Sequence, residues 1–277
     1  MAVASTSELP RRPRAHVVLA LVRRDYLVAR SYRIAFVLDL VLGIINLLIF
    51  FFISRTFRGG SVHELQGAPS YFAFAAVGIA VTVVIEAAST GLSRRIRDEQ
   101  LTGTLEVLVA QPLSALELSL GLAGYPFLFA MGRAAFYILV AAALLGLDLH
   151  DADWLGFALV LLASGVALSS IGVLLGAAVL VVKRGQMIAG LVTFGMGLVS
   201  GAFFPVSVLP AWIRPLGTVV PTRFAFDGLR SALYRGTGWA DDVFWLFVFA
   251  AIGIPVAIKG FTSALDYSKR AGTLSQY

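Results

Sequence analysis

The sequence predicts an all-α integral membrane protein with six transmembrane helices. Of the 277 residues, 58% are hydrophobic and only 14% are charged, whereas a typical soluble domain has roughly 25% charged residues. Six apolar stretches are long enough to cross a hydrocarbon core of about 30 Å, which needs roughly 20 helical residues. No alternating pattern of a membrane β-barrel is present. The expected spans, within a single domain over 1–277, are 35–54, 70–92, 118–146, 154–182, 187–204 and 243–262.

The first span follows a basic segment, residues 14–33, that mixes Val, Leu and Tyr with five arginines. This composition predicts an amphipathic helix lying in the inner headgroup layer of the membrane. Residues 1–13 contain Pro10 and Pro13, which break helices, so a flexible tail is expected there. The apolar run after the arginines lacks a clear small-residue cleavage site, so we expect the first span to be retained.

The distribution of basic residues predicts the orientation. With the N-terminus inside, the inner segments hold 15 basic residues, the outer loops hold six, and Arg133 lies within a span, which accounts for all 22. The positive-inside rule then favours a multi-pass protein of the cell (plasma) membrane with both termini cytoplasmic. The net charge of +6 is thereby explained without a nucleic-acid partner.

A charged segment, residues 94–114, separates the second and third spans on the inner side. Thr102 or Thr104 can cap a short helix whose first turn contains Glu106, and Pro112 ends it. The apolar face of this helix would consist of Leu105, Leu108 and Val109. A helix of about two turns is unstable alone, so it must dock on something. The alternative is a simple connector.

The outer segment 205–236 is divided by four prolines into pieces too short to span. Pro210 can begin one helix, and Thr222 can cap a second that runs to about Tyr234. We expect short re-entrant helices between the fifth and sixth spans; an aromatic belt on an external loop is the alternative. The wetter side of the second helix is expected to carry Arg223, Asp227 and Arg230.

Three charged residues fall inside the expected spans, namely Asp39, Glu86 and Arg133. Charge in lipid is costly, so each needs a partner or an aqueous path. Glu86 and Arg133 reach similar depths, which predicts a salt bridge between the second and third spans. A direct role in substrate passage, snorkelling to headgroups and separate partners are the alternatives.

Small residues recur every four positions along the fifth span: Gly185, Ala189, Thr193, Gly197 and Gly201. Gly172 and Gly176 repeat this spacing in the fourth span. Such faces let helices approach closely. They indicate packing within one bundle or, alternatively, a seam between two copies of the chain.

Several chemistries find no support in the sequence. Cysteine is absent, and the three histidines, His16, His63 and His150, are scattered, so we expect no metal site. No G-x-x-x-x-G-K-[ST] phosphate loop is present, so the chain cannot hydrolyse ATP by that chemistry. We therefore expect a protein that is not itself an enzyme and binds no cofactor.

Two motifs carry a family resemblance. Glu99 to Ser114 fits E-x-L-x-G-T-L-E-x-L-x-x-x-P-L-S, and Ser200 to Leu233 reads SGAFFPVSVLPAWIRPLGTVVPTRFAFDGLRSAL. Both stretches, in this order, resemble the permeases of the ATP-binding-cassette type 2 exporter family. The resemblance covers nearly the whole chain.

The resemblance implies that residues 101–111 form a coupling helix that inserts into a groove on a separate ATPase subunit. Polar contacts from Glu99 and Glu106 are expected there. The residues of this implied contact are Glu99, Leu101, Thr102, Gly103, Thr104, Leu105, Glu106 and Leu108. The residues of an implied outer gate are Phe203, Phe204, Pro205, Pro221 and Gly228.

The resemblance further implies a pair of permeases, identical or not, in membrane lipid with two ATPase subunits that carry ATP and Mg. The expected function is export of a hydrophobic or amphipathic substrate, such as a drug or antibiotic, a lipid or a lipid-linked glycan. An ATP-independent secondary transporter would more often show inverted repeats with broken central helices. A membrane enzyme acting on lipids would need converging catalytic groups, and the three charges within the spans include no histidine or cysteine.

Overall fold

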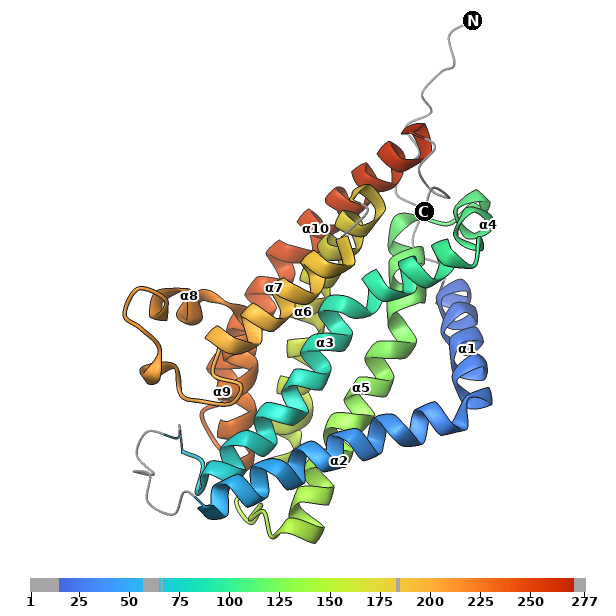
Figure 1. The fold of residues 1–277 in the computed structure, drawn as a ribbon. Coiled ribbons are helices and arrows are strands. Elements are labelled where there is room, and N and C mark those ends of the chain that lie inside the picture. Colours follow the sequence, from blue (N-terminus) through green and yellow to red (C-terminus); the bar gives the residue numbers. More distant parts are fainter. Residues whose placement is uncertain (1–14, 57–64, 66, 183–184, 272–277) are drawn as a thin grey trace, which may run out of the picture.

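The computed structural model describes residues 15–56, 65, 67–182 and 185–271, and every regular element in those ranges is a helix. The predicted tail 1–13 lies outside the described residues. In chain order (Figure 1) the elements are α1 (Ala15–Ser31), α2 (Arg33–Thr56), α3 (Tyr71–Leu101), α4 (Leu105–Ala110), α5 (Ala115–Leu145), α6 (Trp154–Val181), α7 (Gly185–Val199), the 3₁₀ turn η2 (Val206–Val208), α8 (Arg214–Val219), α9 (Pro221–Tyr234) and α10 (Ala240–Ala271).

Within the described part of the chain, five helices are long and apolar enough to cross a membrane: α2, α3, α5, α6 and α10. The fifth expected span, 187–204, is shorter than predicted, because α7 has only 15 residues and ends at Val199. Fifteen residues rise about 22 Å, less than a hydrocarbon core. The helix stops because the chain turns at Gly201, where φ is +85°, and Pro205 follows soon after.

Helices α3 and α6 form the centre of the bundle, with α5 and α10 packed on either side. Gly172 of α6 lies directly on the backbone of α3, since an added Cβ would overlap the carbonyl oxygen of Ala88. This contact uses one of the two small residues predicted for close packing in α6. The hydrophobic core of these helices includes Val84, Ile85 and Leu168.

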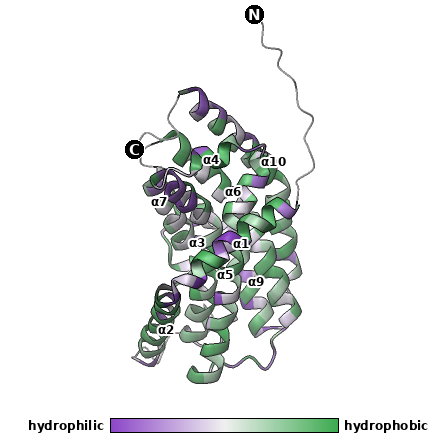
Figure 2. Cartoon of the chain, turned by 90° about the vertical axis from the view of Figure 1, so that its right-hand side faces the viewer, coloured by the Kyte–Doolittle hydropathy of each residue, from purple (hydrophilic) through white to green (hydrophobic). Residues whose placement is uncertain are grey.

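Helices α1 and α2 meet in an elbow at Tyr32 (Figure 1). Helix α1 packs across α5, where Cβ atoms at Gly121 and Gly124 would collide with Leu21 and Val22. Helix α2 is the least covered of the long helices, with only 6% of its most apolar stretch buried. Figure 2 shows hydrophobic residues along the long helices and hydrophilic ones gathered toward the end that carries α4, which we call the α4 end.

At the opposite end of the bundle, the short helices differ from the expectation in their boundaries. The first helix begins at Arg214 rather than Pro210, and the second begins with Pro221 at its first turn. Thr222 does not cap α9; its hydroxyl is hydrogen-bonded to that of Ser200 and lies 3.3 Å from the Met196 carbonyl oxygen. Thr222 thus fastens α9 to the end of α7.

Asp153 caps α6 near the same end. Its carboxylate accepts the backbone N–H groups of Gly156 and Leu155 and the indole N–H of Trp239, at 2.9 to 3.0 Å. These hydrogen bonds, led by that of Gly156, hold the pKa of Asp153 below its ordinary value. The cap also joins α6 to the segment that leads into α10.

Candidate functional site

The connection between α3 and α5 differs from the expectation in two ways: its short helix, α4, has fewer residues than expected, and α3 extends further along the chain. Helix α3 continues to Leu101, and α4 comprises only six residues, so the expected helix 101–111 is split by a turn. Gly103 adopts φ +72° in that turn, a left-handed conformation that favours glycine. Thr104 stands before α4 but makes no side-chain cap.

One face of helix α4 packs against the rest of the chain, and the other face is exposed. Leu105 is 1% exposed and packs in an apolar cluster with residues of α3, α5, α6 and α10. Leu108 and Val109 pack at the edge of this cluster, as the expected apolar face requires. The exposed residues of the turn and of the first half of α4, which we call the α4 surface, are Leu101, Thr102, Gly103, Thr104, Glu106 and Val107.

Glu99 does not belong to the α4 surface. Its side chain is nearly buried, and its carboxylate accepts a hydrogen bond of 2.5 Å from Arg24 of α1 and another from the hydroxyl of Thr104. The structure therefore places this predicted contact residue against its own chain. Glu106, the other predicted polar contact, is exposed.

Asp25 completes an ionic cluster that ties α1 to α3. It is 2% exposed and lies 3.0 Å from Arg24 and 3.1 Å from Arg95. Burial alone disfavours the charge of Arg24, but Asp25 and Glu99 outweigh burial and raise the pKa of Arg24 above its ordinary value. We call Arg24, Asp25, Arg95 and Glu99 the α1–α3 ionic cluster. Sequence analysis missed Asp25, although a lone acid within a helix of arginines is a signal for such a pair.

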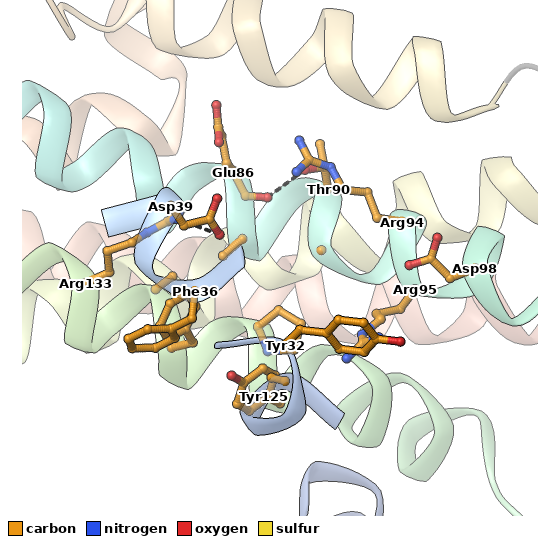
Figure 3. A pocket seen from close by; sticks show the side chains of 16 residues that line it. Tyr32, Phe36, Asp39, Glu86, Thr90, Arg94, Arg95, Asp98, Tyr125 and Arg133 are labelled. Carbon is orange, nitrogen blue, oxygen red and sulfur yellow. Dashed lines mark hydrogen bonds and ion pairs between the residues drawn. The ribbon is translucent and has the colours of Figure 1, made fainter. Parts of the chain in front are cut away.

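The charges within the spans are paired differently from the prediction. Arg133 of α5 lies 3.5 Å from Asp39 of α2, so the predicted Glu86–Arg133 salt bridge is wrong (Figure 3). The hydroxyl of Tyr137, one turn further along α5, donates to the backbone carbonyl of Asp39 at 3.0 Å. Glu86 is exposed, and the described residues offer its carboxylate neither an ion pair nor a hydrogen bond.

Two cavities adjoin the side of α3 that carries Glu86. One, of about 320 Å³, lies between the α1–α2 elbow, α3 and α5, and the other, of about 120 Å³, lies between α3 and α7. Glu86, Thr90 and Arg94 line both cavities and are spaced four residues apart on one face of α3. We call these three residues the α3 ridge (Figure 3).

The small-residue stripe of the fifth span divides into two parts. Gly185, Ala189 and Thr193 are buried on the face of α7 that packs within the chain. Gly197 has open space around its Cα and lines the 120 Å³ cavity, and Gly201 lies beyond the end of the helix. The opposite face of α7 is exposed through Met187, Leu191, Phe194 and Leu198.

The predicted outer-gate residues lie in the turn after α7 and along α9. Phe203 stacks on Phe50 of α2 with ring centroids 5.2 Å apart, and its carbonyl accepts from Tyr71 of α3. Phe204 and Pro205 continue this turn, partly buried. Pro221 is buried at the start of α9, and Gly228 lets α9 approach Val160 of α6.

Arg230 is fully buried, so its assignment to the wetter side of α9 is wrong. Its guanidinium lies 3.5 Å from the ring centroid of Phe74 and donates to the carbonyl of Gly201 at 2.8 Å. A cation over an aromatic face in a dry site is strongly attracted. The sequence does not distinguish this arginine from Arg223 and Asp227, which are partly buried on the same helix and pair with each other at 3.1 Å.

Five apolar helices long enough to span a membrane, one of which is α3 with its polar ridge, define a multi-pass membrane protein. The family model of the ABC-2 type transporter matches residues 16–234, from α1 to the end of α9. The chain belongs to the ABC-2 type transporter family, whose members are membrane components of ABC transporters, generally not catalytic themselves and usually working with an ATP-binding subunit. No curated protein matches the chain in sequence.

Proposed function

We propose that this chain is the transmembrane subunit of an ABC exporter that moves hydrophobic or amphipathic compounds out of the cytosol, driven by separate ATPase subunits. The observation that carries the proposal is that one helix, α3, carries both the polar ridge and, through the turn at Gly103, the exposed α4 surface. A push on that surface is delivered directly to the helix that lines the cavities.

The α4 surface suits a partner groove. Six residues cannot hold a helix in isolation, and α4 is anchored in its own chain chiefly by Leu105. Leu101 and Val107 are 65% and 61% exposed beside the charge of Glu106, a mixture typical of transient interfaces. We assign contact with the ATPase to Leu101, Thr102, Gly103, Thr104, Glu106 and Val107, while Leu105 and Leu108 hold α4 in place.

Glu99 has a different role in this proposal, that of a positioning residue. Its carboxylate accepts hydrogen bonds from Thr104, in the turn before α4, and from Arg24 of α1. Movement of α4 is therefore transmitted to both α3 and α1. ATP and Mg stay on the partner subunits, two of which serve two permease copies. Closure of the ATPases would rock the bundles between inward and outward access.

The α3 ridge is proposed to line the path between two copies of the permease. A carboxylate such as that of Glu86 is costly at membrane depth unless water or a partner reaches it. The ridge lines one cavity together with Phe194 and Leu198 from the exposed face of α7, which supports the proposal that a second bundle would meet this side of the chain. The basic α4 end then faces the cytosol at the cell membrane, with both termini on that side.

Affinity purification from the native host tests the proposal. The tagged chain is extracted in mild detergent, and co-purified proteins are identified by mass spectrometry while ATP hydrolysis is measured. An ATP-binding-cassette ATPase subunit should co-purify, and its hydrolysis rate should differ from that of the isolated subunit. Transport into vesicles that proceeds without any ATPase subunit would instead indicate an ATP-independent transporter.

A further inference from the structure

We propose that the elbow between α1 and α2 binds one anionic phospholipid, with the headgroup phosphate on Arg30 and Arg33 and an acyl chain along Phe36 and Val37. A cavity of about 390 Å³ lies at this elbow, a volume typical of small-molecule sites. The residues that line it, which we call the elbow site, are Tyr26, Ala29, Arg30, Arg33, Phe36, Val37 and Tyr125.

The charge of the elbow site is of one sign. Arg30 and Arg33 are its charged lining residues, whereas the neighbouring 320 Å³ cavity mixes three arginines with Asp39, Glu86 and Asp98. The site therefore selects an anion, and two guanidinium groups can each donate paired hydrogen bonds to a phosphate.

Arg30 and Arg33 are also available, unlike three other arginines of this region. Arg24, Arg95 and Arg133 are each paired with a carboxylate of the chain. Both elbow arginines are exposed, and the described residues supply neither with an ion pair or a hydrogen bond. Two uncompensated guanidinium groups at the edge of an apolar cavity leave their charge for a ligand.

The rest of the site is apolar and held in shape by aromatic contacts. Tyr26 of α1 lies 6.3 Å from Tyr125 of α5, Tyr125 stacks 6.1 Å from Phe129, and Phe129 lies 5.1 Å from Phe36 of α2. This aromatic column joins three helices around the cavity. Aromatic residues of this kind are enriched at the level of lipid headgroups.

The order of charge and apolar surface along α2 matches a phospholipid rather than free phosphate. Val37 follows Arg33 by four residues, about 6 Å along the helix. The arginines therefore lie at one end of the site, and the apolar side chains of Phe36 and Val37 lie next to them along α2. Val37 is 54% exposed and Phe36 42% exposed, open to an acyl chain. Inorganic phosphate would contact only the arginines and would leave Phe36 and Val37 uncovered.

Native mass spectrometry of the full chain, delipidated in detergent, tests the proposal with phosphatidylglycerol and phosphatidylcholine of equal chain length. The wild type should retain one phosphatidylglycerol in preference to phosphatidylcholine. Because both phosphate contacts are lost in R30Q/R33Q, this variant should bind its first phosphatidylglycerol at least tenfold more weakly than the wild type does. The matched control R23Q alters an exposed arginine of α1 that lies outside the site, and this variant should bind the lipid as the wild type does.

A second variant separates lipid from free phosphate. V37S should weaken long-chain phosphatidylglycerol severalfold, and inorganic phosphate at millimolar concentration should not displace the lipid. Equal binding of both lipids, an undiminished first phosphatidylglycerol in R30Q/R33Q, or an equal loss in R23Q would overturn the proposal. Thermal midpoints of all variants are measured alongside, and because the substituted arginines are exposed these should match the wild type.

Discussion

Arg24 of α1 donates a hydrogen bond of 2.5 Å to Glu99 near the end of α3, across 75 residues of sequence. Because Glu99 also accepts a hydrogen bond from the hydroxyl of Thr104, the helix α1, the central helix α3 and the turn before α4 share one carboxylate. A rigid junction at this point lets the three segments move together, whichever of them is displaced first.

A double-mutant cycle measures this junction. Arg24→Gln and Glu99→Gln should each lower the thermal stability of the purified chain, and the double variant should lose less than their sum. The expected coupling is about 1 kcal/mol, kept modest because the Arg24 side chain is 37% exposed and screened by solvent. Arg23→Gln, at an exposed neighbour, is the control. Strictly additive losses would mean that the two side chains do not depend on each other.

Glu106 tests the proposed contact with an ATPase subunit. Glu106→Lys should reduce the amount of co-purified ATPase and the change in its hydrolysis rate by about tenfold, the effect of roughly 1.4 kcal/mol lost at a polar contact. The side chain is exposed, so the thermal midpoint of the isolated permease should be unchanged. Glu106→Gln, which removes charge without reversing it, should have an intermediate effect. Normal assembly and turnover in the lysine variant would remove Glu106 from the interface.

The long helices could be predicted from the sequence because an apolar run of about 20 residues has one stable form in lipid. The predicted stretch 154–182 and the helix α6 (Trp154–Val181) agree almost residue for residue. Helix α7 was predicted too long because apolar composition continues to Phe204, while the turn at Gly201 depends on backbone geometry that hydropathy does not register.

Charge pairing was the least predictable part of the site. Depth along two spans suggests Glu86 as the partner of Arg133, yet the packing of α2 against α5 brings Asp39 to that arginine instead. Helix rotation likewise decides that Glu99 faces Arg24 while Glu106 stays exposed. Periodicity places residues on a face of their own helix; which neighbour that face meets is set by tertiary packing.

Arg230 should be essential to the stability of the region around α9. Arg230→Lys keeps the charge but loses the planar group that lies over Phe74 and reaches the Gly201 carbonyl. We expect a loss of about 2 kcal/mol, from a weakened cation–π contact and a buried carbonyl left unpaired, seen as a drop of several degrees in the thermal midpoint. Arg235→Lys, one turn further on and exposed, should cost less than about 0.5 kcal/mol. Equal losses at the two positions would contradict the buried role of Arg230.

Gly172 sets the distance between the two central helices, α3 and α6, and adding one methyl group at this position should destabilise their packing. In Gly172→Ala the added Cβ overlaps the carbonyl oxygen of Ala88, which is backbone and cannot rotate away, so α3 and α6 must separate. Overpacking of this kind costs about 1–3 kcal/mol. Gly132→Ala in α5 is the matched control, because nothing lies within 4 Å of its added Cβ, and alanine there should be neutral or stabilising by up to about 1 kcal/mol. Thermal unfolding in detergent distinguishes the two, and since α3 carries the ridge, the Gly172 variant should also lose transport more than its stability loss alone explains.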